Sequence, residues 1–293
     1  MNLQNIFNHI ESEDPEFYER TSPRRLAIRT FMKGAALTAL PVALGGLLKK
    51  AYGQTSTDPI AILNFALTLE YLEAEFYQKA VGNASAVGLT GAALGAYTTI
   101  RDHEAAHVKF LTATITKLAG ASQVAPKPNF DFSGGVGSAS GTGNGPFKTV
   151  FTNYDVLLAV SQTFEDTGVR AYKGQAANIM DDKYNDVLQA ALQIHSVEAR
   201  HAAHIRYMRA NRGGSVVDGN PKPWITQDKS NIQTGNNDAN AAIQRTYAGE
   251  NATNQAGVDI ASFVSADLAT ESFDEPLDKD AVLAIVKPFI ITP

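Results

Sequence analysis

A glutamate followed seven positions later by a tyrosine, and then by a Glu-x-x-His motif, occurs twice in this chain. The first copy consists of Glu70, Tyr77, Glu104 and His107, and the second of Glu165, Tyr172, Glu198 and His201. The two glutamates are 34 residues apart in the first copy and 33 apart in the second. Little else aligns between the copies, so the repeat is one of chemistry more than of sequence.

Helical geometry explains this spacing. Residues three apart lie on one face of a helix, so Glu104 and His107 can bind one ion together, as can Glu198 and His201. Residues seven apart are nearly eclipsed after two turns. The spacing therefore predicts Tyr77 above Glu70, and Tyr172 above Glu165.

Apolar residues recur at helical spacing in four stretches, which predict helices over residues 58–81, 92–119, 153–180 and 185–211. Asp58 and Pro59 form a helix start, and Gly120 ends the second helix. Residues 121–147 are rich in Gly, Ser, Pro and Asn and predict a long exposed connection. The chain is therefore expected to be all-α, with two helical hairpins joined by a long crossover loop into a four-helix bundle.

The repeated acidic residues share their helix faces with apolar side chains, so four carboxylates and two imidazoles are expected in one bundle core. Unpaired buried carboxylates cost several kcal/mol each, and their mutual repulsion adds to this cost. Two divalent cations would offset the charge directly. The sequence thus predicts a metal site formed by Glu70, Glu104, His107, Glu165, Glu198 and His201.

The chain contains no cysteine, which excludes disulfides, iron–sulfur clusters and thiolate zinc sites. Carboxylate and histidine ligands suit two iron or manganese ions better than structural zinc, and they do not decide between the two metals. The formal net charge is −5, with acidic and basic residues well mixed, so we expect no nucleic-acid partner.

Three parts of the chain differ in composition. Residues 1–53 are expected to be an export signal, because basic residues precede a short apolar run and a small-residue exit. The apolar run, residues 34–48, is shorter than the roughly 20 residues of a membrane span. Residues 54–213 contain the bundle, and residues 214–293 form a mixed extension with a final helix over 278–286. Most of residues 214–257 are expected to be surface loop.

The export segment resembles a twin-arginine signal through the sequence RTFMK at residues 29–33. It departs from that pattern because Ile28 precedes Arg29, and the paired arginines, Arg24 and Arg25, come four residues too early. An ordinary amphipathic helix is the alternative. The resemblance implies a periplasmic or extracellular location.

The ligand pattern and the two-hairpin arrangement resemble the ferritin-like superfamily of di-metal carboxylate proteins. Residues 63–77, LNFALTLEYLEAEFY, are similar to its exported, desiccation-associated branch, and so is SFDEPL at residues 272–277. By position, the resemblance implies that Glu70 and Glu165 are terminal ligands and that Glu104 and Glu198 bridge the metals. The resemblance also implies that His107 and His201 each bind one metal. It implies that Tyr77 and Tyr172 are catalytic groups, which orient carboxylates or supply an electron.

Several alternatives stay open at this stage. Glu73 competes with Glu70, because it lies one turn later near the same face. Tyr77 and Tyr172 can also be plain core aromatics. His103, His195 and His204 fall off the inner face and are expected at the surface or behind the ligands, and no role is expected for His9.

The expected function is redox chemistry at the two metals, with dioxygen, hydrogen peroxide or ferrous iron as the small substrate. Ferroxidase and peroxide-removing activities both fit. A structural or assembly-forming bundle with a non-catalytic metal site is the main alternative, and a homo-oligomer is possible. An oxygenase would need an apolar pocket beside the metals. A cage-forming iron store fits less well, because long extensions flank the bundle.

Overall fold

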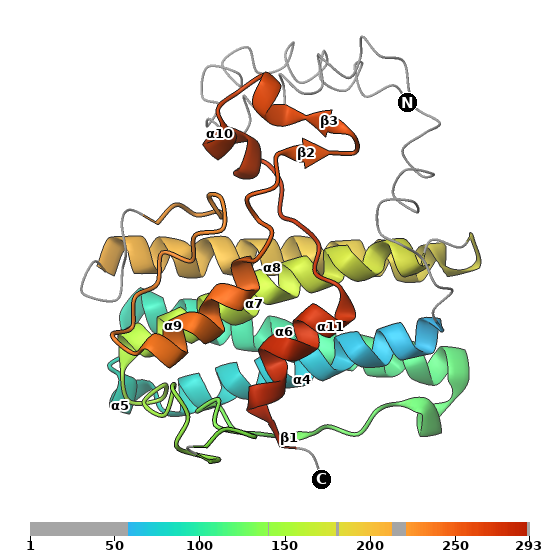
Figure 1. Cartoon of the computed structure of the whole chain (residues 1–293). Coiled ribbons are helices and arrows are strands. Elements are labelled where there is room, and N and C mark those ends of the chain that lie inside the picture. Colours follow the sequence, from blue (N-terminus) through green and yellow to red (C-terminus); the bar gives the residue numbers. More distant parts are fainter. Residues whose placement is uncertain (1–57, 140, 180–181, 213–220, 292–293) are drawn as a thin grey trace.

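The computed structural model describes residues 58–291 except residues 140, 180–181 and 213–220. Its long helices are α4 (Pro59–Gly82), α6 (Gly91–Ala119), α7 (Tyr154–Ala176) and α8 (Asn185–Arg212). α4 packs against α6 and α7 against α8, and the two hairpins form a four-helix bundle (Figure 1). The predicted all-α bundle is confirmed, whereas the expected export segment lies outside the described residues.

The helix ends follow local chemistry. Asp58 caps α4 by accepting a hydrogen bond from the backbone N–H of Ile60 at 3.0 Å, and Pro59 occupies the first turn. Gly120 ends α6 with a φ of 95°, which a residue with a Cβ adopts only under strain. The third helix is shorter than predicted, because a 3₁₀ turn, η3 (Ala177–Ile179), replaces its last turn.

α7 is the central helix of the molecule. Residues 157–172 are buried without a break, although a bundle covers only one side of each of its helices. The other side of α7 is polar, and the C-terminal extension covers it. This arrangement makes the extension part of the folded domain.

The extension contains α9 (Asn237–Gln244), α10 (Ala266–Thr270) and α11 (Lys279–Val286), the 3₁₀ turns η5 (Arg245–Tyr247), η6 (Ile260–Ser262) and η7 (Lys287–Phe289), and the strands β2 (Asn254–Gln255), β3 (Val258–Asp259) and β4 (Ile290–Ile291). α11 occupies the segment where the sequence predicts a final helix. The expectation of a surface loop before it is wrong for several residues: Ile243 and Tyr247 are fully buried. None of the helices in the described residues is long and apolar enough to span a membrane.

A buried polar network holds the extension on the bundle. Arg206 of α8 donates to Asp166 of α7 over 3.2 and 2.5 Å. The Tyr247 hydroxyl donates to the same carboxylate at 2.6 Å and accepts from the Gln162 side-chain amide at 2.9 Å. Arg170, one turn beyond Asp166, pairs with Glu250 at 2.7 Å. The polar face of α7 is thus satisfied by Arg206 of α8 and by two residues of the extension, Tyr247 and Glu250, about 80 positions away.

The crossover between the hairpins is η2 (Ala121–Gln123), β1 (Asn129–Phe130) and irregular chain, with α5 (Ala84–Val87) and η4 (Asp182–Tyr184) in the short connections within the hairpins. The expectation of an exposed crossover is wrong for part of it: residues 121–123 and 142–144 are exposed, whereas Phe130, Phe132 and Phe147 are buried in the core. Asp131 stabilises the buried turn by accepting backbone hydrogen bonds from Ser133, Gly135 and Gly143. β1 also pairs antiparallel with β4, which aligns Phe130 with Ile290.

Candidate metal centre

The bundle brings the six predicted ligand residues together at its centre. Each hairpin contributes one lone glutamate, from α4 or α7, and one Glu-x-x-His motif, from α6 or α8. All four glutamates are 0% exposed, and the histidines are 8% and 5% exposed. The helical spacing of the motifs therefore predicted the inner faces correctly.

The first group of ligands surrounds His107. Its Nδ1 lies 3.1 Å from one carboxylate oxygen of Glu70, of Glu104 and of Glu198. The second group surrounds His201, whose Nδ1 lies 2.9 Å from Glu104, 3.2 Å from Glu165 and 3.5 Å from Glu198. Within each group, the possible ligand atoms all lie within 4.8 Å of one another.

Glu104 and Glu198 belong to both groups. Oε2 of Glu104 faces His107 and its Oε1 faces His201. Glu198 divides its two oxygens between the same histidines. Glu70 and Glu165 each belong to one group alone. Two overlapping groups with two shared carboxylates are the arrangement expected of a di-metal site.

The polar atoms of this centre are poorly satisfied within the described part of the chain. Oε1 of Glu104, both oxygens of Glu165 and of Glu198, and Nδ1 of His201 are buried without a well-directed hydrogen bond. Buried polar groups in folded proteins nearly always have such partners. Four carboxylates carry a charge of −4, which two divalent cations would neutralise. The residues present therefore fit a pair of metal ions.

The pKa values reflect the same crowding. Burial raises the pKa of Glu165 to about 7. Burial by itself would lower the pKa of His201. The negative charge of Glu165 and the close contact with Glu104 together have the larger effect and raise this pKa to about 12. The buried carboxylates thus favour the charged form of the histidines, as they would favour any cation placed among them.

A sequence model of the ferritin-like domain matches residues 58–211, more than half of the chain. The chain belongs to the ferritin-like domain family. Its match ends within one residue of the bundle helices at both ends. Neither the curated proteins nor the solved structures compared with it gave a significant match.

The two tyrosines of this ferritin-like domain reach across the bundle. The Tyr172 hydroxyl of α7 donates a short hydrogen bond to Oε1 of Glu70 on α4. Conversely, Tyr77 of α4 lies beside Glu165 of α7. Burial and the Glu165 charge raise the pKa of Tyr77 well above its usual range. Each tyrosine thus contacts the lone glutamate of the other hairpin, and not the one on its own helix that the spacing predicts.

Glu73, the competitor of Glu70, is buried but belongs to neither ligand group. Its pKa is raised well above the usual range by burial and by the charges of Glu198 and Glu104. It lies beside Gly168, where a Cβ would come within 3.3 Å of Oε1 of Glu73. Glu73 is therefore a buried neighbour of the centre and not one of its candidate ligands.

His103 lies directly behind His201, in agreement with the expectation of a place at the surface or behind the ligands. Its Nδ1 is 2.9 Å from Nε2 of His201, the ring nitrogen that faces away from the carboxylates. A bond to this nitrogen fixes the orientation of a metal-binding imidazole. His195 instead contacts the Val169 carbonyl at 2.9 Å.

The centre has a solvent-facing side between α6 and α8. A broad hollow of about 780 Å³ lies there, lined in part by His103, Arg200, His201 and His204. His204 therefore lies on the outer surface of α8, as expected. His201 both lines the hollow and belongs to the second ligand group, so the hollow extends to that group.

Proposed function

We propose that this ferritin-like domain binds two iron or manganese ions and carries out redox chemistry on dioxygen or hydrogen peroxide. The observation that carries the proposal is the division of oxygens of Glu104 and Glu198 between the two histidine-centred groups. Two ions held by shared carboxylates supply two electrons to one small molecule, which a single ion does poorly.

The protein residues then have distinct tasks. Glu104 and Glu198 would hold both ions, whereas Glu70 and Glu165 would each hold one. The hydroxyl of Tyr172 fixes the orientation of Glu70, and His103 fixes the ring of His201. The hollow beside His103 gives polar molecules and ions a route to the centre.

Metal content tests the proposal. The wild-type protein, reconstituted with iron or manganese, is expected to hold two ions per chain by elemental analysis, and the Glu104→Ala/His201→Ala double variant is expected to hold none. Glu75→Gln is the control, because Glu75 lies on α4 but pairs with Lys79 at 3.6 Å, outside the centre.

Loaded protein is then assayed for ferrous oxidation and for peroxide consumption. Ferrous oxidation balances when two ferrous ions each give one electron to dioxygen, which takes up two protons and leaves as hydrogen peroxide. Loaded protein that performs neither reaction would support the alternative, a structural bundle with a non-catalytic metal site. A folded wild-type protein that binds no metal would refute the proposal.

We also propose that the protein is exported as a member of the desiccation-associated branch. The basic stretch and apolar run within residues 1–53, and the similar sequences at residues 63–77 and 272–277, support this proposal. Mass spectrometry of the protein from a cell envelope fraction should find a new N-terminus near residue 53. Intact protein confined to the cytosol would contradict export.

A further inference from the structure

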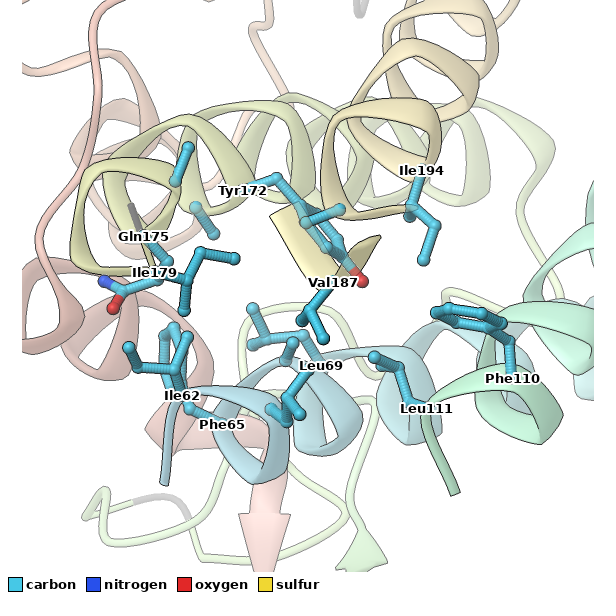
Figure 2. A pocket seen from close by; sticks show the side chains of 15 residues that line it. Ile62, Phe65, Leu69, Phe110, Leu111, Tyr172, Gln175, Ile179, Val187 and Ile194 are labelled. Atoms are coloured by element: carbon cyan, nitrogen blue, oxygen red, sulfur yellow. The ribbon is translucent and has the colours of Figure 1, made fainter. Parts of the chain in front are cut away.

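A small apolar cavity lies in the bundle core between the two hairpins. Side chains of α7 and α8 face those of α4 and α6 across it (Figure 2). Its walls are apolar side chains, except that Tyr172 and Gln175 also carry polar atoms. All four bundle helices contribute to it, as they do to the metal centre.

The cavity lies one helical turn from the proposed ligands. On α4, Ala66 of the wall is four residues before Glu70. On α8, Ile194 of the wall is four residues before Glu198. On α6, Leu111 follows His107 by four residues. Four residues rise about 6 Å along a helix, so the cavity adjoins the centre.

Tyr172 separates the two spaces. Its ring lines the cavity, while its hydroxyl donates to Glu70 in the first ligand group. At the outer side, Phe110 is 41% exposed and Val187 is half-buried. A small molecule can therefore enter by movement of exposed side chains and meet Tyr172 before the metals.

Size and polarity limit what the cavity can hold. Its volume is about 30 Å³, and one water molecule needs roughly 10–15 Å³ on this measure. Two bonded heavy atoms fit, whereas the organic substrate of an oxygenase does not. Apolar cavities stay dry and bind apolar gases such as xenon. Hydrogen peroxide would lose its hydrogen bonds to water there without replacing them.

We propose that this cavity is a binding site for dioxygen, the apolar diatomic substrate, beside the di-metal centre. The inference rests on the proposed function and makes it more specific, because it assigns dioxygen to the cavity and polar species to the hollow near His103. In the reaction, one electron from each metal and two protons convert dioxygen to hydrogen peroxide. The cavity itself supplies only binding and proximity.

Xenon tests the site without any metal. Crystals of the full chain pressurised with xenon should show an atom beside Tyr172. Ala66→Leu adds three carbon atoms to the wall and should abolish this xenon peak. Ala61→Leu is the matched control, because Ala61 lies on the same helix but is exposed and outside the cavity. No xenon in the wild type, or a peak that persists in Ala66→Leu, would overturn the inference.

Kinetics of the metal-loaded protein test the substrate. Ala66→Leu should raise the KM for dioxygen and leave the KM for hydrogen peroxide unchanged, while Ala61→Leu should change neither. An equal change for both substrates would overturn the assignment of dioxygen and leave the metal function intact. Failure to load metal would instead refute the proposed function, and the xenon measurement would still decide whether the cavity binds an apolar gas.

Discussion

The shared carboxylates decide the chemistry at the scale of single residues. A glutamate has two oxygens, and in Glu104 and Glu198 each oxygen faces a different histidine. Glu70 is different, because Tyr172 binds one of its oxygens and His107 contacts the other. Glu165 has Tyr77 beside it in the corresponding place, so each lone glutamate meets a tyrosine of the other hairpin.

Replacing Tyr172 by phenylalanine should weaken the half of the centre that contains Glu70. Loss of a group that orients a ligand typically lowers metal affinity about 10–100-fold. Metal titration of Tyr172→Phe should therefore show one site weakened by about tenfold or more. Tyr207→Phe, at a tyrosine that is 56% exposed, should bind as the wild type does. Equal affinities in all three proteins would contradict an orienting role.

The meeting of the six candidate ligand residues in the bundle core could be predicted from the sequence, because helical spacing decides which residues share a face. Which residues of different helices contact one another could not be predicted in this way. The spacing placed Tyr77 over Glu70, but the side chain crosses to Glu165, since the packing of α4 against α7 determines its neighbours. His103 was expected at the surface or behind the ligands, but its contact with His201 could not be predicted, because it joins two helices.

At the scale of elements, two ion pairs connect α7 with α8 in different environments. Asp166 and Arg206 are both buried, whereas Asp155 and Arg212 are partly exposed. Buried pairs contribute little net stability when intact, but a single buried charge is costly. Exposed pairs contribute about 0–1 kcal/mol. The two pairs therefore offer a matched comparison on one helix pair.

Asp166→Asn should lower the free energy of unfolding by about 3–5 kcal/mol, because it leaves the Arg206 charge buried without its partner. Asp155→Asn should lower it by about 1 kcal/mol or less. Denaturant unfolding of the two variants measures the difference. A similar loss of unfolding free energy in the two variants would show that water reaches the polar face of α7.

The crossover shows why loops are harder to predict than helices. Its Gly, Ser and Asn residues indicate a surface segment, and most of them do form turns. Phe130 and Phe132 are nevertheless buried, because β4 pairs with β1 and Phe132 packs against Phe76 of α4. Local composition carries no information about a partner 160 residues away.

At the scale of the whole molecule, the bundle and the extension share one hydrophobic core. Val282 of α11 and Phe76 of α4 belong to the same buried cluster. β2, β3 and α10 lie farther from the four-helix bundle (Figure 1). Because α11 and the bundle share this core, we expect residues 58–291 to unfold as one unit.

Val282→Asp tests this unity. A carboxylate in place of a fully buried valine should destabilise the protein by several kcal/mol. Calorimetry should show one transition at a lower temperature, with the bundle melting together with the extension. Ala284→Asp, on the exposed side of the same helix, should melt close to the wild type. A separate, unshifted bundle transition would show that the two parts fold independently.

The pairing of β1 with β4 also governs when the fold can be completed during synthesis. Phe130 leaves the ribosome long before Ile290, its partner in the strand pair. Chains begin to fold from the N-terminus as they emerge, so both hairpins exist while the polar face of α7 still lacks its cover. A nascent chain stalled before residue 290 would hold all six ligand residues but not the closed structure. Emergence of residue 290 is thus the event that lets β1 find its partner and complete the cover of the crossover.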